Sequence, residues 1–169
     1  QYIPSGAARY RRSTMKLAIF SDSHGSTQKM FDAITELRPD AVVHLGDGER
    51  DVALLKERFP DLPVHAVRGN CDFLPVSPET ELFEVCGVRI FITHGHLYGV
   101  KSTRAKLLEE AARRGASVAM YGHTHTAQLV QTNDFFLLNP GSCGYAASPS
   151  CAELIVSPDG TLDARIIRL

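Results

Sequence analysis

Five short segments of the sequence place Asp, His or Asn directly after an apolar run. They are Asp22-Ser23-His24, Gly46-Asp47, Gly69-Asn70-Cys71-Asp72, His94-Gly95-His96 and Gly122-His123-Thr124-His125. A single His-x-His pair also occurs on solvated turns, so each histidine taken alone fits a loop position. Together the segments offer carboxylate, imidazole and amide groups, which suit divalent ions such as Mn, Fe, Zn or Mg. We therefore expect metal ligation.

Strand-like and helix-like patterns alternate in the first part of the chain. The apolar runs at 16–20, 40–45 and 62–67 predict strands. Helical spacing follows at 26–37, which Ser26 would cap, and at 49–59, which Pro60 ends. Such alternation predicts an α/β fold with parallel strands. Because the carboxyl ends of parallel strands face one crevice, we expect the polar segments to converge there.

The rest of the chain reads as further strands around one helix. Residues 81–85 and 88–96 predict a hairpin around Cys86 and Gly87, and 117–125 predicts another strand. A helix is expected at 102–114, with a Ser102 cap, an inner side formed by Leu107, Leu108 and Ala111, and a left-handed Gly115. The remaining residues predict two hairpins, with turns at 133–134 and 158–160.

The spacing within the segments suggests how they would bind metal. Residues two apart on an extended chain project to the same side, so Asp22 and His24, or His123 and His125, can approach a common centre. The glycines at 46, 69, 95 and 122 would let the backbone turn sharply. The ligands are too many for one tetrahedral ion. Two ions roughly 3.5 to 4 Å apart form the usual clamp for displacement at phosphorus, and we expect Asp47 to bridge them.

The ordered set of segments resembles the calcineurin-like metallophosphoesterases, and within them the small phosphodiesterase branch. The resemblance also includes "AVRGNCD" at 66–72, "THGHLYG" at 93–99 and "NPGS" at 139–142, and it covers residues 15–169. It implies a four-layer sandwich in which two mixed β-sheets are flanked by α-helices. It further implies that one ion is held by Asp22, His24 and His125, the other by Asn70, His94 and His123, with Asp47 between them.

The resemblance also implies an activity. A hydroxide shared by two divalent ions would attack the phosphorus of a small or nucleotide-like phosphodiester in line. Mn²⁺ is favoured as the ion, while Fe, Zn, Ni, Co or Mg would also suit the ligands. Two alternatives stand beside this interpretation: a phosphomonoesterase or nucleotidase, and a non-catalytic scaffold for protein assembly on the same fold. The complete ligand set favours catalysis over the scaffold.

One position departs from the larger phosphatases, which carry histidine directly after the asparagine as a general acid. Cys71 stands there in this chain. Because a neutral thiol is a poor substitute, we expect weak action on esters of strongly basic alcohols unless His96 or a metal-bound water supplies the proton. The candidate catalytic and substrate-binding residues are thus Asn70 and His96, although His96 is equally well read as a supporting partner of the metal ligands.

Other polar residues have simpler alternatives. Cys71 could fill space beside the metals rather than react, and Asp72 could orient Asn70 or cap a turn. Arg50 and Arg68 could meet phosphate or form surface ion pairs. "NPGS" is read as a turn rather than as a wall of the site. The two remaining histidines, His44 and His65, lie inside expected strands, where hydrogen-bonded structural positions fit best.

The composition sets outer bounds. With 169 residues, of which 44% are apolar, we expect one domain at 15–169. Residues 1–14 read as a disordered tail or a remnant of expression. A net charge of −1 offers no broad cationic face for long nucleic acid. Four cysteines without zinc-ribbon spacing fit a cytoplasmic protein, and no run is long and apolar enough to span a membrane. A homo-oligomer is compatible with the sequence.

Overall fold

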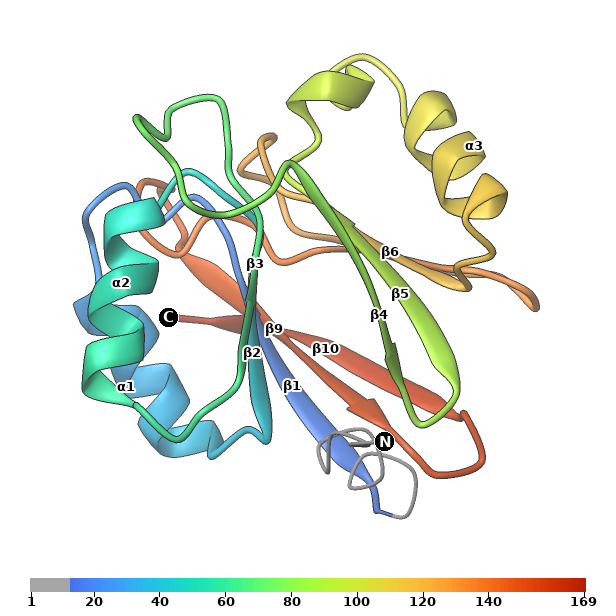
Figure 1. Ribbon diagram of the computed structural model, residues 1–169, viewed down its shortest axis with the longest axis horizontal. Helices are drawn as coiled ribbons and strands as arrows, with labels where there is room; N and C mark the ends of the chain where they lie inside the picture. Colours follow the sequence, from blue (N-terminus) through green and yellow to red (C-terminus); the bar gives the residue numbers. More distant parts are fainter. Residues whose placement is uncertain (1–12) are drawn as a thin grey trace, which may run out of the picture.

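The computed structural model describes residues 13–169, whose strands form two five-stranded sheets (Figure 1). The strands of the first sheet are β1 (Met15–Phe20), β2 (Ala41–His44), β3 (Val64–Ala66), β9 (Ser150–Val156) and β10 (Leu162–Arg168). Those of the second are β4 (Thr80–Val85), β5 (Val88–Thr93), β6 (Val118–Met120), β7 (Gln128–Gln131) and β8 (Phe136–Asn139). The spatial orders are β10-β9-β1-β2-β3 and β4-β5-β6-β8-β7.

Both sheets are mixed, with a parallel centre. In the first sheet β1, β2 and β3 pair in parallel, whereas β9 and β10 are antiparallel. In the second sheet β5, β6 and β8 are parallel, and β4 and β7 run antiparallel to their neighbours. The carboxyl ends of the parallel strands therefore lie at one end of each sheet, as the alternating pattern predicts.

The helices cover the outer faces of the two sheets (Figure 1). The first sheet is flanked by α1 (Gln28–Leu37) and α2 (Glu49–Arg58), and the second by α3 (Ala105–Arg113). A short 3-10 helix, η2 (His96–Tyr98), follows β5. This arrangement confirms the predicted sandwich of two mixed β-sheets between α-helical layers.

Alternation of side chains along each strand builds the core on both sides of a sheet. In β1, Leu17 and Ile19 pack between the two sheets, whereas Ala18 and Phe20 pack under the helices. All four are fully buried. Burying a side chain the size of leucine or phenylalanine contributes roughly 1.5–3 kcal/mol. The same period of two gives β1 two buried faces and holds its carboxyl end rigidly.

Two helices begin later than the sequence predicts. The cap of α1 is Thr27 rather than Ser26, and neither α1 nor α3 has a side-chain cap hydrogen bond. The α3 helix starts at Ala105, because the amides of Ser102 and Thr103 both bind the carbonyl oxygen of Gly99 and so extend the preceding turn through these residues. Leu108, expected on the inner side, is 36% exposed. At the other end, Gly115 has the predicted left-handed backbone, with φ of 68°.

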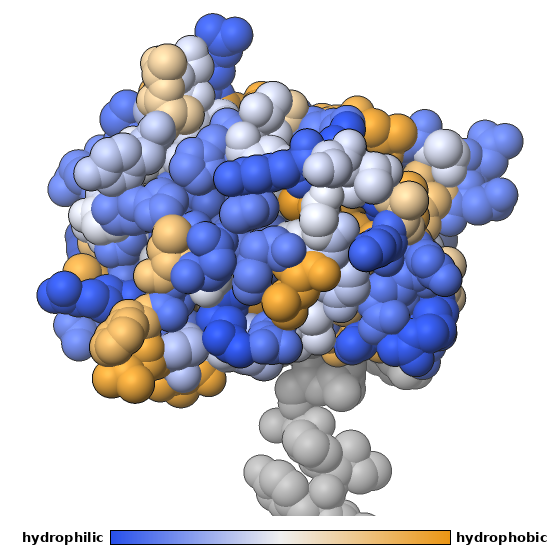
Figure 2. All heavy atoms as spheres, turned by 90° about the horizontal axis from the view of Figure 1, so that it is seen from above, coloured by the Kyte–Doolittle hydropathy of each residue, from blue (hydrophilic) through white to orange (hydrophobic). Residues whose placement is uncertain are grey.

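A tail was expected at residues 1–14. Of these, 1–12 lie outside the described residues. Within 13–169, no helix is both long and apolar enough to cross a membrane. The face that carries the carboxyl ends of the strands is mostly hydrophilic, with apolar side chains gathered at a few places (Figure 2).

Candidate metal centre

All seven candidate ligands come from loops that follow parallel strands. Asp22 and His24 follow β1, Asp47 follows β2, and Asn70 follows β3 in the first sheet; His94 follows β5, and His123 and His125 follow β6 in the second. The structure brings these side chains into one connected cluster, although they belong to two different sheets.

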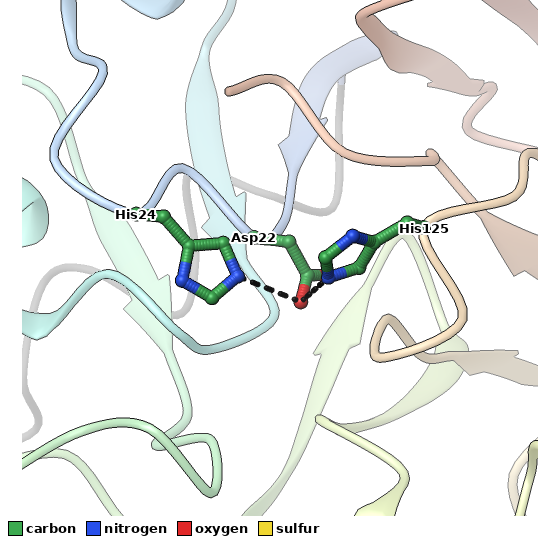
Figure 3. A group of neighbouring side chains, drawn as sticks. All are labelled: Asp22, His24 and His125. Carbon is green, nitrogen blue, oxygen red and sulfur yellow. Dashed lines mark ion pairs between the residues drawn. The ribbon is translucent and has the colours of Figure 1, made fainter. Parts of the chain in front are cut away.

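Asp22 lies between two histidines in the first group of side chains (Figure 3). Its Oδ1 atom is 3.1 Å from Nε2 of His125 and 3.8 Å from Nε2 of His24. The carboxylate is fully buried, whereas the two rings are partly exposed. One potential ligand atom from each residue lies within 4.8 Å of the other two, so the group is compatible with one cation.

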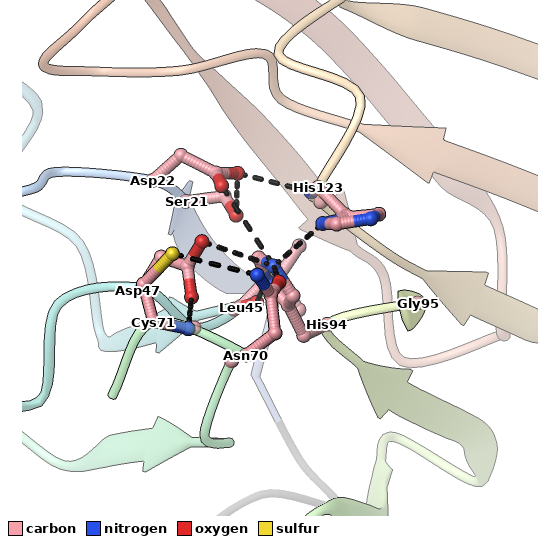
Figure 4. A network of polar contacts seen from close by, with 12 residues as sticks. Ser21, Asp22, Leu45, Asp47, Asn70, Cys71, His94, Gly95 and His123 are labelled. Carbon is pink, nitrogen blue, oxygen red and sulfur yellow. Dashed lines mark hydrogen bonds and ion pairs between the residues drawn. The ribbon is translucent and has the colours of Figure 1, made fainter. Parts of the chain in front are cut away.

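His94 is the centre of the second group (Figure 4). Its Nδ1 donates to the carbonyl oxygen of Leu45 at 2.7 Å, which directs Nε2 into the site. Around Nε2 lie Oδ1 of Asn70 at 3.1 Å, Nδ1 of His123 at 3.2 Å and Oδ2 of Asp47 at 3.3 Å. The group therefore directs several ligand atoms at one point.

Asp47 faces both groups. Its Oδ2 atom lies 3.7 Å from Nε2 of His24 and 3.3 Å from Nε2 of His94. Its other oxygen, Oδ1, accepts a hydrogen bond of 2.8 Å from the backbone amide of Cys71, which holds the carboxylate in this orientation. Oδ2 of Asp47 is therefore the atom that contacts a histidine of each group.

The cluster has the properties of a cation site. Oδ1 of Asp22 and Nε2 of His24 are buried and have no hydrogen-bond partner among residues 13–169, a costly arrangement unless a cation satisfies them. Burial alone raises the pKa of Asp47, yet the hydrogen bond and charge of His94 bring it well below its usual value. Burial, with the charges of His94 and Lys101, lowers the pKa of His123 to about 4, so this ring is neutral, as a metal ligand must be. The residues fit divalent metal.

The backbone carries these ligands differently from the extended geometry that the spacing suggests. Eight described non-glycine residues have positive φ, and five of them are candidate ligands: Asp22 (54°), His24 (45°), Asp47 (57°), His123 (68°) and His125 (57°). A left-handed backbone costs a non-glycine residue roughly 1–2 kcal/mol, although Asp and His tolerate it better than most. Asp22 and His24 do approach a common centre, as the spacing predicts, whereas His123 and His125 belong to different groups. The extended backbone assumed for both pairs was wrong, because the loops are left-handed at these residues.

The glycines serve two different purposes. Gly46 and Gly95 have φ of 99° and 105°, which is the sharp turn that was predicted. Gly69 and Gly122 do not have positive φ. They are small because neighbours approach closely: a Cβ atom at 69 would lie 2.0 Å from Oδ1 of Asp47, and one at 122 would lie 2.0 Å from Oγ of Ser21.

The comparison with known proteins agrees with this geometry. The sequence pattern of the calcineurin-like phosphoesterase superfamily domain matches residues 15–157. The chain belongs to this superfamily. The predicted resemblance is therefore confirmed, and with it the class of metallophosphoesterase.

Individual relatives support the same assignment. A protein of Bacillus subtilis named "Probable metallophosphoesterase YsnB" is 35% identical over 131 residues, covering 76% of this chain and 75% of that protein. "Phosphodiesterase YfcE" of Escherichia coli K12 is 32% identical over 152 residues, covering 76% of this chain and 79% of that protein.

Solved structures extend the comparison to the fold. A predicted phosphoesterase from Streptococcus pneumoniae is similar with a TM-score of 0.73 at 25% identity, covering 93% of this chain and 99% of that chain. Vps29 of Entamoeba histolytica, in complex with zinc, has a TM-score of 0.70 at 23% identity, covering 91% and 99% of the two chains. The second similarity concerns the fold alone.

Several residues of this phosphoesterase support the ligands without having been predicted to do so. The hydroxyl of Ser21 donates to Oδ2 of Asp22 at 2.5 Å, and the backbone amide of His123 donates to the same oxygen at 3.1 Å. The second contact ties the loops of the two sheets together. The contact of Ser21 is with its own neighbour in the chain, whereas the contact of His123 depends on a loop from the other sheet and leaves no signal in the sequence.

A buried relay lies beneath the loop that carries Asp22 and His24. Nδ1 of His44 accepts from the amide of Gly46 at 3.3 Å, so its Nε2 donates to Oγ of Ser23 at 3.0 Å, and that hydroxyl donates to Oδ2 of Asp51 at 2.6 Å. Asp51, in the first turn of α2, also accepts from the amide of Gly25. His44 is thus the hydrogen-bonded strand residue that was expected, and its relay positions the ligand loop.

The "NPGS" segment is more than a turn. The side-chain amide of Asn139 donates to the carbonyl oxygen of Gly122 at 3.1 Å and to Oγ1 of Thr124 at 3.0 Å. The hydroxyl of Ser142 donates to the carbonyl oxygen of Asp22 at 2.8 Å. The interpretation as a plain turn was therefore incomplete, because the two buried side chains hold both ligand loops in place.

Asp72 binds backbone rather than orienting Asn70. Its carboxylate accepts from the amides of Gly69, Asp47 and Glu49, at 2.7 to 2.9 Å, and so joins the loop after β3 to the loop after β2. Arg68 forms the surface ion pair that was its simpler alternative, with Glu79. Arg50 lines a cleft of about 510 Å³ that also borders His24, Asp47 and the exposed ring of Phe73.

Cys71 and His96 lie beside the ligands. Cys71 is exposed, and its Sγ lies 3.4 Å from the side-chain amide of Asn70; burial and the charge of Asp47 raise the pKa of its thiol. The ring of His96 lies 5.4 Å from that of His94, and its buried Nδ1 has no hydrogen-bond partner within residues 13–169. No described hydrogen bond therefore links His96 to a ligand in a supporting role.

Proposed function

We propose that the protein is a binuclear metal-dependent phosphodiesterase that hydrolyses small or nucleotide-like phosphodiesters. The observation that carries the proposal is the position of Asp47, whose Oδ2 faces His24 of one ligand group and His94 of the other. Asp22, His24 and His125 would hold one ion, and Asn70, His94 and His123 the other. Mn²⁺ is the ion we favour.

Two divalent ions bound here would supply a nucleophilic oxygen at neutral pH and neutralise charge on the phosphoryl group. The chain's own residues mainly position the reaction. Asp47, held through Oδ1 by the amide of Cys71, keeps the two ligand groups together. Asn70 places a neutral amide next to His94, where it is also available to a phosphoryl oxygen. His96, with its unpartnered Nδ1, is the side chain we assign to the phosphate or the leaving group.

A diester is favoured over a monoester because two separate clefts border the ligand loops, one lined by His24 and Asp47 and the other by Thr124, so a second ester arm would have room. The position after Asn70 holds Cys71, whose thiol is a weak proton donor, so esters with good leaving groups are favoured.

The first test compares metal-free and Mn²⁺-loaded protein on bis(p-nitrophenyl) phosphate and p-nitrophenyl phosphate. We expect chelation to abolish hydrolysis, Mn²⁺ to restore it, and kcat/KM for the diester to exceed that for the monoester by about tenfold or more. Equal activity of metal-free and loaded protein would refute any metal-dependent function.

Two other outcomes would favour the alternatives. A higher kcat/KM for the monoester would indicate a phosphomonoesterase or nucleotidase. Fully occupied metal sites without hydrolysis of any ester would favour a scaffold, the alternative for which the Vps29 structures offer a precedent of fold.

A further inference from the structure

A second cleft, of about 440 Å³, contains none of the proposed ligands but is lined by Thr124, which lies between His123 and His125 in the sequence. Lys101 and Arg104, from the segment before α3, line it together with Thr124 and Thr126, which follow β6, and Gln128, the first residue of β7. The cleft therefore borders the loop that carries two of the proposed ligands.

The charged residues that line this cleft are all cationic. No Asp or Glu lines it, and neither Lys101 nor Arg104 forms an ion pair with any residue of the described chain. This contrasts with Arg113 and Arg114, at the end of the following helix, which both pair with Glu110. Cations without counter-charges in a concave wall raise the local concentration of anions.

The remaining lining suits a polar anion rather than an apolar group. Thr124 and Thr126 line it with hydroxyls that donate to each other's carbonyl oxygens, and the side-chain carbonyl oxygen of Gln128 accepts from the hydroxyl of Tyr121, which leaves the amide nitrogen of Gln128 as a donor. Arg104 uses Nη1 to donate to the carbonyl oxygen of Val100, which leaves further guanidinium donors for a ligand. Guanidinium and ammonium donors form charge-assisted hydrogen bonds with phosphate oxygens.

The other cleft, of about 510 Å³, carries charges of both signs. Arg50 lines it together with Asp47, Glu49, Asp51 and Asp72, and Leu54 and Phe73 add apolar side chains. The four carboxylates disfavour a second anionic group of a substrate there. The cleft with Lys101 and Arg104 has cations and no carboxylate in its lining, so it is the better suited of the two to such a group.

We propose that Lys101 and Arg104 form a subsite for a second phosphate carried by the substrate, so that the preferred substrates are phosphodiesters with an additional phosphate on one ester arm. The inference rests on the proposed function, because it concerns an arm attached to the scissile phosphate. It names two residues, Lys101 and Arg104, that would make the enzyme prefer diesters with a second phosphate over diesters without one.

Binding provides a test that does not require turnover. Calorimetry on the Mn²⁺-loaded protein would compare thymidine 3′,5′-bisphosphate with thymidine 5′-phosphate, which differ only in the second phosphate. We expect the bisphosphate to bind about tenfold more tightly to the unmodified protein. Lys101→Gln and Arg104→Gln should each reduce this ratio several-fold, whereas Lys101→Arg should retain most of it. Lys106→Gln, which removes an exposed charge from α3 outside the cleft, is the matched control and should leave the ratio unchanged.

Kinetics on matched diesters complete the test. Release of p-nitrophenol from the 5′-(p-nitrophenyl phosphate) of thymidine would be compared with release from its 3′-phosphorylated form. We expect a KM ratio of about ten in favour of the 3′-phosphorylated diester, diminished in Lys101→Gln and Arg104→Gln.

Equal affinities for the two nucleotides, no binding of either, or a ratio that survives both substitutions would overturn the subsite. A preserved binding ratio without hydrolysis of either diester would instead refute the phosphodiesterase and leave the phosphate subsite standing.

Discussion

Oδ1 of Asp22 lies 3.1 Å from Nε2 of His125, which joins the loop after β1 in one sheet to the loop after β6 in the other. The backbone amide of His123 binds the other oxygen of the same carboxylate. One buried aspartate thus contacts both halves of the "GHTH" segment. This relationship makes the metal centre a junction between the two sheets rather than a feature of either.

The two histidines of that segment should serve different ions. His125→Asn is expected to empty the group of Asp22 and His24 preferentially, and His123→Asn the group of Asn70 and His94, because each variant removes a ligand atom from only one group. Metal analysis after gel filtration should find about one Mn²⁺ per chain in each variant and about two in the unmodified protein. His65→Gln, a histidine outside the cluster, is the control. Loss of both ions from both variants would contradict the assignment.

Asp47→Asn should affect both groups at once. The substitution keeps the size of the side chain but removes the charge that faces His24 and His94. We expect both metal occupancies to fall and kcat on bis(p-nitrophenyl) phosphate to drop more than about 100-fold. If one occupancy were unaffected, Asp47 would belong to a single ion and would not be shared.

Asn139→Ala should weaken the site without removing any ligand. The buried amide of Asn139 binds Gly122 and Thr124, so its loss leaves polar groups of the ligand loop unsatisfied. We expect about 1–3 kcal/mol of lost stability in urea unfolding and a 10–100-fold weaker Mn²⁺ affinity. Asn133→Ala, in the exposed turn between β7 and β8, is the matched control and should change neither quantity. A purely structural role would lower the stability and leave the metal affinity intact.

His44 should make folding stability depend on pH. Burial, only partly offset by the charges of Asp22 and Asp51, lowers the pKa of His44 in the folded protein. As the pH falls below the unfolded value of about 6.5, the unfolded chain takes up the proton first and stability is lost. We expect stability to fall by up to about 1.4 kcal/mol per pH unit below that value because of this residue.

Urea unfolding between pH 5 and pH 7.5, with a chelator present, would measure the effect. His44→Gln can keep the hydrogen bond to Ser23 without titrating, so its stability should vary less with pH than that of the unmodified protein. Identical pH dependence in the two proteins would mean that His44 does not titrate on unfolding.

His96→Ala should lower kcat most for esters with poor leaving groups. If His96 donates a proton to the departing alcohol, its loss should lower kcat at least about tenfold more for an alkyl ester than for a p-nitrophenyl ester of the same phosphate. Cys71→Ala should leave the hydrolysis of both esters within about threefold at full metal occupancy, because its thiol is a weak acid. An equal loss for both esters in His96→Ala would restrict His96 to binding.

Much of the fold could be predicted because its signals are local. The alternation of Leu17 and Ile19 with Ala18 and Phe20 identifies a strand that is buried on both faces, since side chains along a strand point alternately to either side. Helix boundaries were less accurate. Ser102 is a good cap by residue type, but its backbone is already hydrogen-bonded in the turn at Gly99.

The sequence by itself determined which residue types end the apolar strands, and through them the family and the candidate ligands. These properties depend on side-chain chemistry and on neighbours along the chain. Only the tertiary structure decided that Asp22 meets His125, that Asp47 faces both ligand groups, and that Asn139 holds the loop between them. Likewise, the spacing of His123 and His125 does not reveal their left-handed backbone, nor the hydrogen bond from the amide of His123 to Asp22 in the loop of the other sheet. Contacts between distant segments arise from packing, so the spacing of residues along the chain does not predict which side chains meet.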